Sequence, residues 1–179
     1  MPELKGTQTE QNLKKAFAGE SMARNQYTYF AEQAKASGLT EIAEFFERLA
    51  INEREHARVW FNLIYGEDKT LEENLEKAIA GEHAEWTDMY VEFANEARKE
   101  GFNDIAKLFT HVKQVERNHE RELLHLLKGL KEGNTQEEQV TDIATASVES
   151  WMCGYCGFTT ESSKALEVCP LCGRDIIRL

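Results

Sequence analysis

Proline and cysteine are scarce along most of this sequence of 179 residues. The two prolines, Pro2 and Pro170, leave residues 3–169 free of the residue that most strongly breaks helices. All four cysteines lie between positions 153 and 172, so the preceding chain must fold without disulfides. Clustered cysteines in a chain without a recognisable export signal favour a metal site over disulfides.

The sequence also lacks an excess of positive charge and long apolar runs. The 21 Lys and Arg residues face 32 Asp and Glu residues, which gives a formal net charge of −11. This balance argues against nucleic acid or an anionic membrane as the main partner. Residues 1–10 lack the basic and apolar regions of a signal peptide, and no window approaches the roughly 18 apolar residues of a membrane span. We therefore expect a soluble cytoplasmic protein.

Apolar residues recur with helical spacing in four segments, which are separated by glycine or by a capping signal. The segments are 10–36, 39–65, 70–99 and 102–130, and each carries one apolar stripe. The sequence therefore predicts four amphipathic helices. A polar stretch that is poor in large apolar residues follows them, and we interpret residues 136–150 as a linker.

The helical region is an internal duplication. Residues 31–56 align with residues 94–119 at an offset of 63, and nine of the 26 positions are identical. Upstream, after one gap, Gly19-Glu20 pairs with Gly81-Glu82. Each copy is thus a helical hairpin with Gly-Glu on its first helix and Glu-x-x-His on its second. Two such hairpins are expected to pack as a four-helix bundle with approximate two-fold symmetry.

Acidic and histidine side chains interrupt the apolar stripes at matching places in both copies. Carboxylates buried without cations would be unstable or would become protonated, and Lys and Arg are absent from these positions. A pair of metal ions explains them most simply. Oxygen ligands with one imidazole per metal suit iron or manganese, and the sequence leaves both open. The candidate ligands are Glu20, Glu53, His56, Glu82, Glu85, Glu116 and His119.

Other polar residues of the helices have weaker claims to a role. Tyr27 follows Glu20 by two helical turns on the same face, where a hydrogen bond to the site and a place in the core are equally compatible with the spacing. The angular position of Tyr90 relative to Glu82 is less certain. Three histidines without a partner in the repeat are interpreted as surface or boundary residues: His83, His111 and His125.

The carboxy-terminal cysteines form two C-x-x-C pairs, Cys153/Cys156 and Cys169/Cys172, separated by twelve residues. This spacing predicts four thiolates in a tetrahedron around one metal ion. A zinc ribbon and a single iron both fit the motif when it stands alone. Iron is favoured here, because a redox-active pair of metals in the same chain needs a source of electrons.

In this order, the motifs resemble the rubrerythrin family over essentially the whole chain. The resemblance implies a mainly α fold, with a ferritin-like di-iron four-helix bundle over residues 1–135 and a rubredoxin-like domain over residues 151–179. It implies that the seven acidic and histidine residues named above bind two irons, with Glu53 and Glu116 bridging. It also implies that the four cysteines bind one iron and that Tyr27 and Tyr90 lie near the di-iron site.

The resemblance further implies a peroxidase that reduces hydrogen peroxide to water in defence against oxidative stress. Its electrons would come from a donor such as rubredoxin or an NAD(P)H-dependent reductase. In the family, one iron exchanges a histidine for a glutamate on oxidation, and the matching pair here is His56 and Glu85. The alternative is a ferroxidase or iron-handling protein with a structural zinc ribbon, which would share the bundle but would not need a cysteine-bound iron.

The length of the second connection bears on assembly. Ferritin-like bundles have parallel second and third helices, so their connection runs back along the bundle. Glu82 follows Glu53 by 29 positions. If each helix extends about 12 residues beyond the metal plane, about 5 connecting residues remain, and they reach roughly 17 Å against a return path of about 36 Å. A connection within one chain would require shorter helices, with Leu71 or Leu75 in the connection. We expect a homodimer or higher oligomer, and whether the two hairpins are exchanged between chains stays open.

Overall fold

The computed structural model describes residues 3–66, 69–133, 150–161 and 167–174. The chain divides into two compact units, Met1–Lys69 and Thr70–Leu179. The predicted linker over residues 136–150 lies outside the described residues except for Ser150. Within the described residues, no helix is long and apolar enough to cross a membrane.

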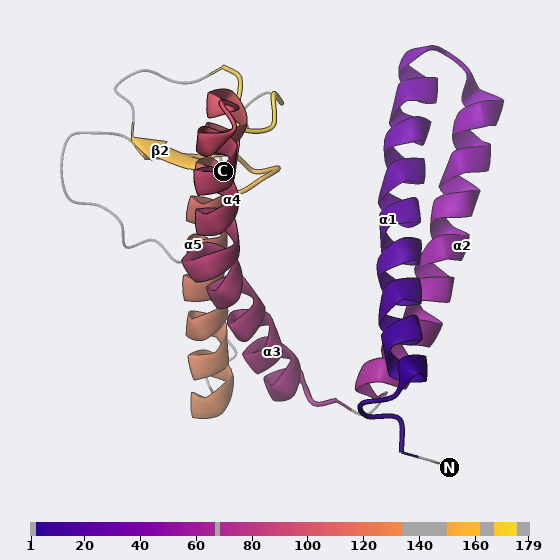
Figure 1. The fold of residues 1–179 in the computed structure, drawn as a ribbon. Helices are drawn as coiled ribbons and strands as arrows, with labels where there is room; N and C mark the ends of the chain where they lie inside the picture. The colour runs from indigo at the N-terminus through magenta and orange to yellow at the C-terminus, as the bar shows by residue number, and fades with distance from the viewer. Residues whose placement is uncertain (1–2, 67–68, 134–149, 162–166, 175–179) are drawn as a thin grey trace. The chain divides into compact units, whose positions relative to one another are not determined.

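The first unit is an antiparallel pair of helices, α1 (Gln8–Ala36) and α2 (Thr40–Tyr65) (Figure 1). The Thr7 side chain accepts a hydrogen bond from the amide of Glu10, which caps the start of α1. The chain reverses at Gly38, whose φ of +72° lies in the left-handed region that favours glycine. The inner face is lined by small buried residues that let the two helices approach closely: Ala31, Ala34, Ala43 and Ala57.

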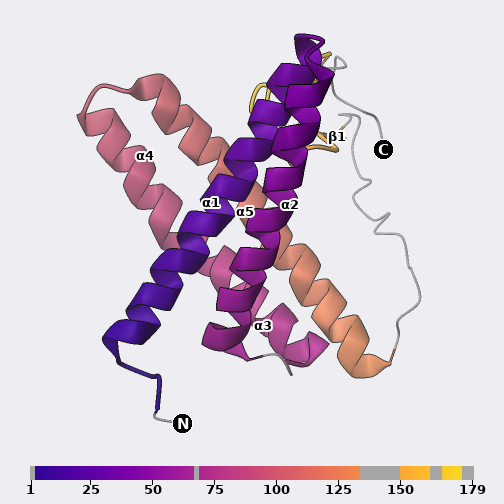
Figure 2. The ribbon, with the colours of Figure 1, turned by 90° about the vertical axis from the view of Figure 1, so that its right-hand side faces the viewer.

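The second unit contains a helical run that changes type part-way. It consists of α3 (Leu71–Ala84), the π-helix η1 (Glu85–Met89) and α4 (Tyr90–Lys99). Thr70 and Glu73 form a capping box at the start of α3. A turn at Gly101, with φ +87°, leads into α5 (Asn103–Glu132), and this turn joins α4 to α5 in Figure 2.

The predicted duplication is confirmed by matching contacts in the two units. Tyr27 lies 6.0 Å from Phe46, and the corresponding Tyr90 lies 6.1 Å from Phe109, measured between ring centroids. The two turns also match, because the amide of Leu39 donates to the Ala34 carbonyl as the amide of Phe102 donates to that of Ala97. The predicted helical segments are therefore present, with ends shifted by one or two residues. The predicted helix over 70–99 contains a π-helix that the stripe did not indicate.

The cysteine region forms a short hairpin and two knuckles. Strand β1 (Ser150–Met152) pairs antiparallel with β2 (Thr159–Glu161), with Trp151 opposite Thr160. The amide of Gly157 donates to the Cys153 carbonyl at 2.9 Å, and the amide of Gly173 donates to the Cys169 carbonyl at the same distance. Both knuckles therefore have the same backbone turn.

Candidate metal centres

The first hairpin brings three of the predicted metal ligands together. Glu20 lies on α1, and Glu53 and His56 lie one turn apart on α2. The Nδ1 atom of His56 lies 2.8 Å from a Glu53 carboxylate oxygen and 3.9 Å from one of Glu20. One ligand atom from each residue falls within 4.8 Å of the others, so the group could hold a metal ion.

The second hairpin repeats this arrangement. The Nδ1 atom of His119 lies 2.8 Å from a Glu116 oxygen on the same helix and 3.6 Å from Glu82 Oε2 on α3. Glu82 Oε2 is buried and has no hydrogen-bond partner within the described part of the chain. A buried carboxylate oxygen without a partner is costly, and a metal ion would satisfy it. The residues therefore fit the metal that their donor atoms predict.

Glu85 lies beside the second group but outside its tight cluster. Burial, and after it the charge of Glu82, raises the pKa of the Glu85 carboxyl, and the same two causes raise that of Glu116. This accumulation of carboxylates disfavours their charged forms, which a bound cation would reverse. Tyr90 shares this environment: burial raises its pKa, and the nearby glutamate charges raise it further.

The sequence predicts that all seven ligands face one core. The structure places Glu20, Glu53 and His56 in the first unit, and Glu82, Glu85, Glu116 and His119 in the second. Of the two tyrosines, Tyr90 lies near its unit's acidic residues, and Tyr27 lies in an aromatic cluster with Phe30 and Phe46.

The four cysteines converge as predicted. The sulfur atoms of Cys153 and Cys172 are 3.8 Å apart, and those of Cys156 and Cys169 are 3.6 Å apart. These distances exclude disulfides, whose S–S bond is about 2.05 Å. They match the edge of a tetrahedron, about 3.8 Å, around a metal with bonds of about 2.3 Å to sulfur. The geometry fits a tetrahedral metal ion.

The electrostatics of the knuckles also favour a bound cation. Burial raises the pKa of the Cys153 thiol, but hydrogen bonds from the amides of Tyr155 and Cys156, together with those to the Cys156 and Cys169 side chains, lower that pKa to about 7. Burial is the main cause that raises the pKa of Cys156 to about 12. A bound cation would relieve the repulsion between adjacent thiolates and so favour their charged forms.

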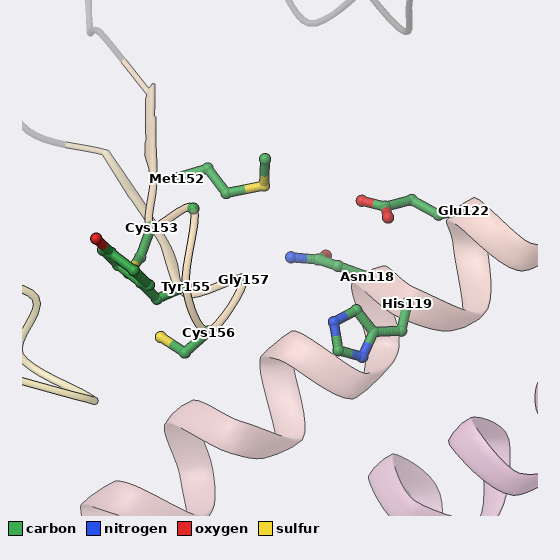
Figure 3. A pocket seen from close by; sticks show the side chains of 9 residues that line it. Asn118, His119, Glu122, Met152, Cys153, Tyr155, Cys156 and Gly157 are labelled. Carbon is green, nitrogen blue, oxygen red and sulfur yellow. The ribbon is translucent and has the colours of Figure 1, made fainter. Parts of the chain in front are cut away.

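The first knuckle packs against α5 next to a candidate ligand of the second hairpin (Figure 3). A Cβ atom added to Gly157 would lie 3.0 Å from Val115 Cγ1 and 3.3 Å from His119 Nε2. The Asn118 amide donates a hydrogen bond to the Thr159 hydroxyl at 3.2 Å. A cavity of about 340 Å³ opens beside this contact, between α5 and residues 152–157.

Sequence reasoning did not identify this contact. His111 is partly buried, as a boundary residue is expected to be, and its ring packs on Phe158 with 5.1 Å between centroids. The contact joins residues about 40 positions apart across the predicted linker, and no periodicity or motif spacing signals such a pairing.

Comparison with known proteins identifies the family. The rubrerythrin family model matches residues 11–127, and the model of the rubrerythrin rubredoxin-like domain matches residues 151–176. The chain belongs to the rubrerythrin family. A rubrerythrin of Nitratidesulfovibrio vulgaris is 40% identical, with 96% of this chain and 93% of the relative covered. A rubrerythrin of Porphyromonas gingivalis is also 40% identical, and the match covers 94% of this chain and 87% of the relative.

Among solved structures, the fully reduced, all-ferrous state of nigerythrin is 27% identical to this chain, with 97% and 86% of the two chains covered and a TM-score of 0.40. Rubrerythrins are oxidoreductases with a ferritin-like fold, a di-iron site of glutamate and histidine residues, and a rubredoxin-like domain whose four cysteines hold one iron. The two kinds of ligand group in this chain correspond to these two cofactors.

Proposed function

We propose that the chain is a di-iron peroxidase. It reduces hydrogen peroxide to two waters with two electrons and two protons, and the electrons enter through the cysteine-bound iron. One observation carries the proposal: Gly157, the neighbour of Cys156, lies against Nε2 of His119, whose Nδ1 faces Glu116 and Glu82. This contact would give electrons from a cysteine-bound iron a short path through protein atoms to a di-iron site at these ligands.

The chain's own residues have distinct parts in this function. The carboxylates and imidazoles hold two irons, which when bound supply the electrons that break the O–O bond. The residues that would hold them are Glu20, Glu53, His56, Glu82, Glu85, Glu116 and His119, and by the family resemblance Glu53 and Glu116 would be shared between the two irons. Tyr27 and Tyr90 are hydrogen-bond donors next to the site. Tyr90 suits this part because it lies near Glu82, Glu85 and Glu116, whose charges contribute to raising the pKa of its phenol.

The reaction needs an external reductant. The acidic chain carries no motif for a nicotinamide cofactor, so the electrons come from a separate protein, a rubredoxin or an NAD(P)H-dependent reductase. Such a donor would deliver them to the cysteine-bound iron, because Cys172 and Tyr155 are exposed on the knuckles.

The proposal is tested by metal analysis, a visible spectrum and addition of peroxide to the reduced protein. We expect three irons per chain and the thiolate-to-iron charge-transfer absorption of the cysteine site. One equivalent of peroxide should oxidise the pre-reduced di-iron centre without releasing oxygen. If zinc occupies the cysteine site and peroxide does not react faster than oxygen, the iron-handling alternative is correct.

The variant Cys156→Ser separates the two centres. It should lose electron delivery from the external donor, while the chemically reduced di-iron centre still reacts once with peroxide. The ligand sets do not overlap, so iron loading of the glutamate and histidine site should be unchanged. A variant that loads this iron but no longer reacts after chemical reduction would contradict the proposed division of labour.

A further inference from the structure

The second hairpin contains one residue more than the first between matching positions. Tyr27 follows Glu20 by seven positions, whereas Tyr90 follows Glu82 by eight. From Tyr90 onward the two copies match at a constant offset. The extra residue therefore lies between Glu82 and Tyr90, which is where the structure has its five-residue π-helix, η1.

Backbone and side-chain bonds show how the extra residue is accommodated. The amide of Tyr90 donates to the carbonyl of Glu85, five residues earlier, where an α-helix would use the residue four earlier. The Thr87 hydroxyl donates to the carbonyl of His83 at 2.7 Å along the same turn. The wider turn begins at Glu85, so its register decides where that carboxylate lies.

Side chains tie this π-helix to α5. The indole N–H of Trp86 donates to a carboxylate oxygen of Glu120, and the other oxygen of Glu120 lies 2.8 Å from His83 Nδ1. The Arg117 guanidinium lies 5.6 Å from the centre of the Trp86 ring, on which His83 packs edge-on. We call His83, Trp86 and Glu120 the clasp. It joins the residue after Glu85 to the residue after His119.

The first hairpin has no equivalent of the clasp. Counted from the Gly-Glu pairs, the positions of His83 and Trp86 correspond to Ser21 and Arg24, and Glu120 corresponds to the buried Ala57. The position of Glu85 corresponds to Ala23. The extra carboxylate, the π-helix and the clasp therefore occur together in one copy and are absent together from the other.

We propose that the clasp is a positioning device for Glu85. By holding Trp86 against α5, it keeps the extra residue as a π-helix at Glu85 and the carboxylate on the side of Glu82 and His119. If the π-helical turn became α-helical, the register of the helix would shift by one residue. Glu85 would then rotate by about 100° around the helix axis, away from those ligands. The inference rests on the proposed role of Glu85 as an iron ligand.

The first test uses metal-free, full-length protein, so it does not depend on the proposed reaction. In Trp86→Phe, hydrogen exchange of the amides of residues 85–90 should be about tenfold faster or more, because a hydrogen bond to a charged group is lost. Trp60→Phe is the matched control, since the buried Trp60 indole nitrogen has no hydrogen-bond partner among the described residues. Unchanged exchange in Trp86→Phe would overturn the proposal.

The second test asks whether Glu85 moves. In the iron-loaded, oxidised protein, the spectrum of the di-iron centre in Trp86→Phe should shift in the same direction as in Glu85→Ala, with Trp60→Phe unchanged. Glu120→Gln keeps an acceptor for the indole and should preserve most of the wild-type spectrum, whereas Glu120→Ala should not. Faster exchange with an unshifted spectrum would overturn the positioning role. Failure of the wild-type protein to reduce peroxide would overturn the proposed function and leave both readouts interpretable.

Discussion

Gly157 allows a sharp test of the contact between the first cysteine knuckle and α5. Its φ is +69°, and Gly173 has a φ of +71° at the matching place in the second knuckle. A Cβ at position 157 would approach Val115 and His119, whereas a Cβ at 173 meets nothing within 4 Å in the described part of the chain. Gly157→Ala and Gly173→Ala therefore share the backbone strain and differ in the contact with α5.

The structure gives the size of the expected effect. The shared strain of a left-handed alanine is about 1–2 kcal/mol. Carbon atoms in contact lie about 3.5–4.0 Å apart, so the methyl group that Gly157→Ala introduces would overlap Val115 by roughly 0.5–1 Å. An extra methyl group in a filled contact costs about 1–3 kcal/mol. This cost lowers the equilibrium constant for packing of the first cysteine knuckle against α5 by about 5- to 150-fold.

Stopped-flow absorption measures the consequence. Fully reduced, iron-loaded protein is mixed with peroxide, and the returning thiolate-to-iron absorption reports electrons leaving the cysteine-bound iron. This phase should slow by up to the same factor in Gly157→Ala and stay near the wild-type rate in Gly173→Ala. Equal rates in the two variants, at equal iron content, would show that electrons do not depend on this contact.

Three further predictions concern stability and assembly. Ala43 and Ala106 occupy matching buried positions, with side chains 0% and 1% exposed. Ala43→Leu and Ala106→Leu should therefore each lower the free energy of unfolding, measured by urea titration, by about 1–3 kcal/mol. A loss in only one variant would contradict the equivalence of the two positions. Thr70→Ala removes the side-chain cap of α3 and should cost about 1 kcal/mol in the same titration, without altering the visible spectrum. The third prediction tests whether hairpins are exchanged between chains. If they are, a mixture of Glu53→Ala and Glu116→Ala chains should regain activity after joint unfolding and refolding, because a mixed dimer contains one intact site. No recovery would indicate that each site is built within one chain.

The sequence predicts those parts of the fold that depend on local spacing. Helical periodicity locates the four segments, and the turns at Gly38 and Gly101 follow from glycine between two stripes. Glu-x-x-His places both side chains on one helix face, so the 2.8 Å approach of His56 to Glu53 was foreseeable. The two C-x-x-C pairs are equally local, which is why their convergence is confirmed.

The parts that sequence reasoning missed depend on contacts between distant residues. The gap in the duplication signalled an inserted residue, but not that a π-helix would absorb it instead of a loop. That outcome depends on the bond from Trp86 to Glu120, 34 positions away. The contact of Gly157 with His119 similarly joins two elements whose separate patterns contain no information about each other.

The apolar stripes show a further limit of local patterns. They predict that Phe30, Ile42 and Leu108 lie in a core, yet these side chains are 44%, 48% and 43% exposed. Small alanines and some aromatic side chains fill the inner face of each hairpin, whereas these three stripe residues remain substantially exposed. An apolar stripe indicates that a helix face is buried in a contact, but it does not indicate whether the partner belongs to the same chain or to another one.

The helix bounds bear on that question. Glu53 lies 12 residues before the end of α2, and Glu82 lies 11 residues after the start of α3, so each helix extends about 16–18 Å beyond its ligand. Leu71 and Leu75 belong to α3, which leaves only residues 66–70 to connect the helices. Five residues reach roughly 17 Å, about half of what a parallel arrangement of α2 and α3 within one chain requires. We therefore expect a second copy of the chain to cover the exposed stripes and to complete the ligand sets.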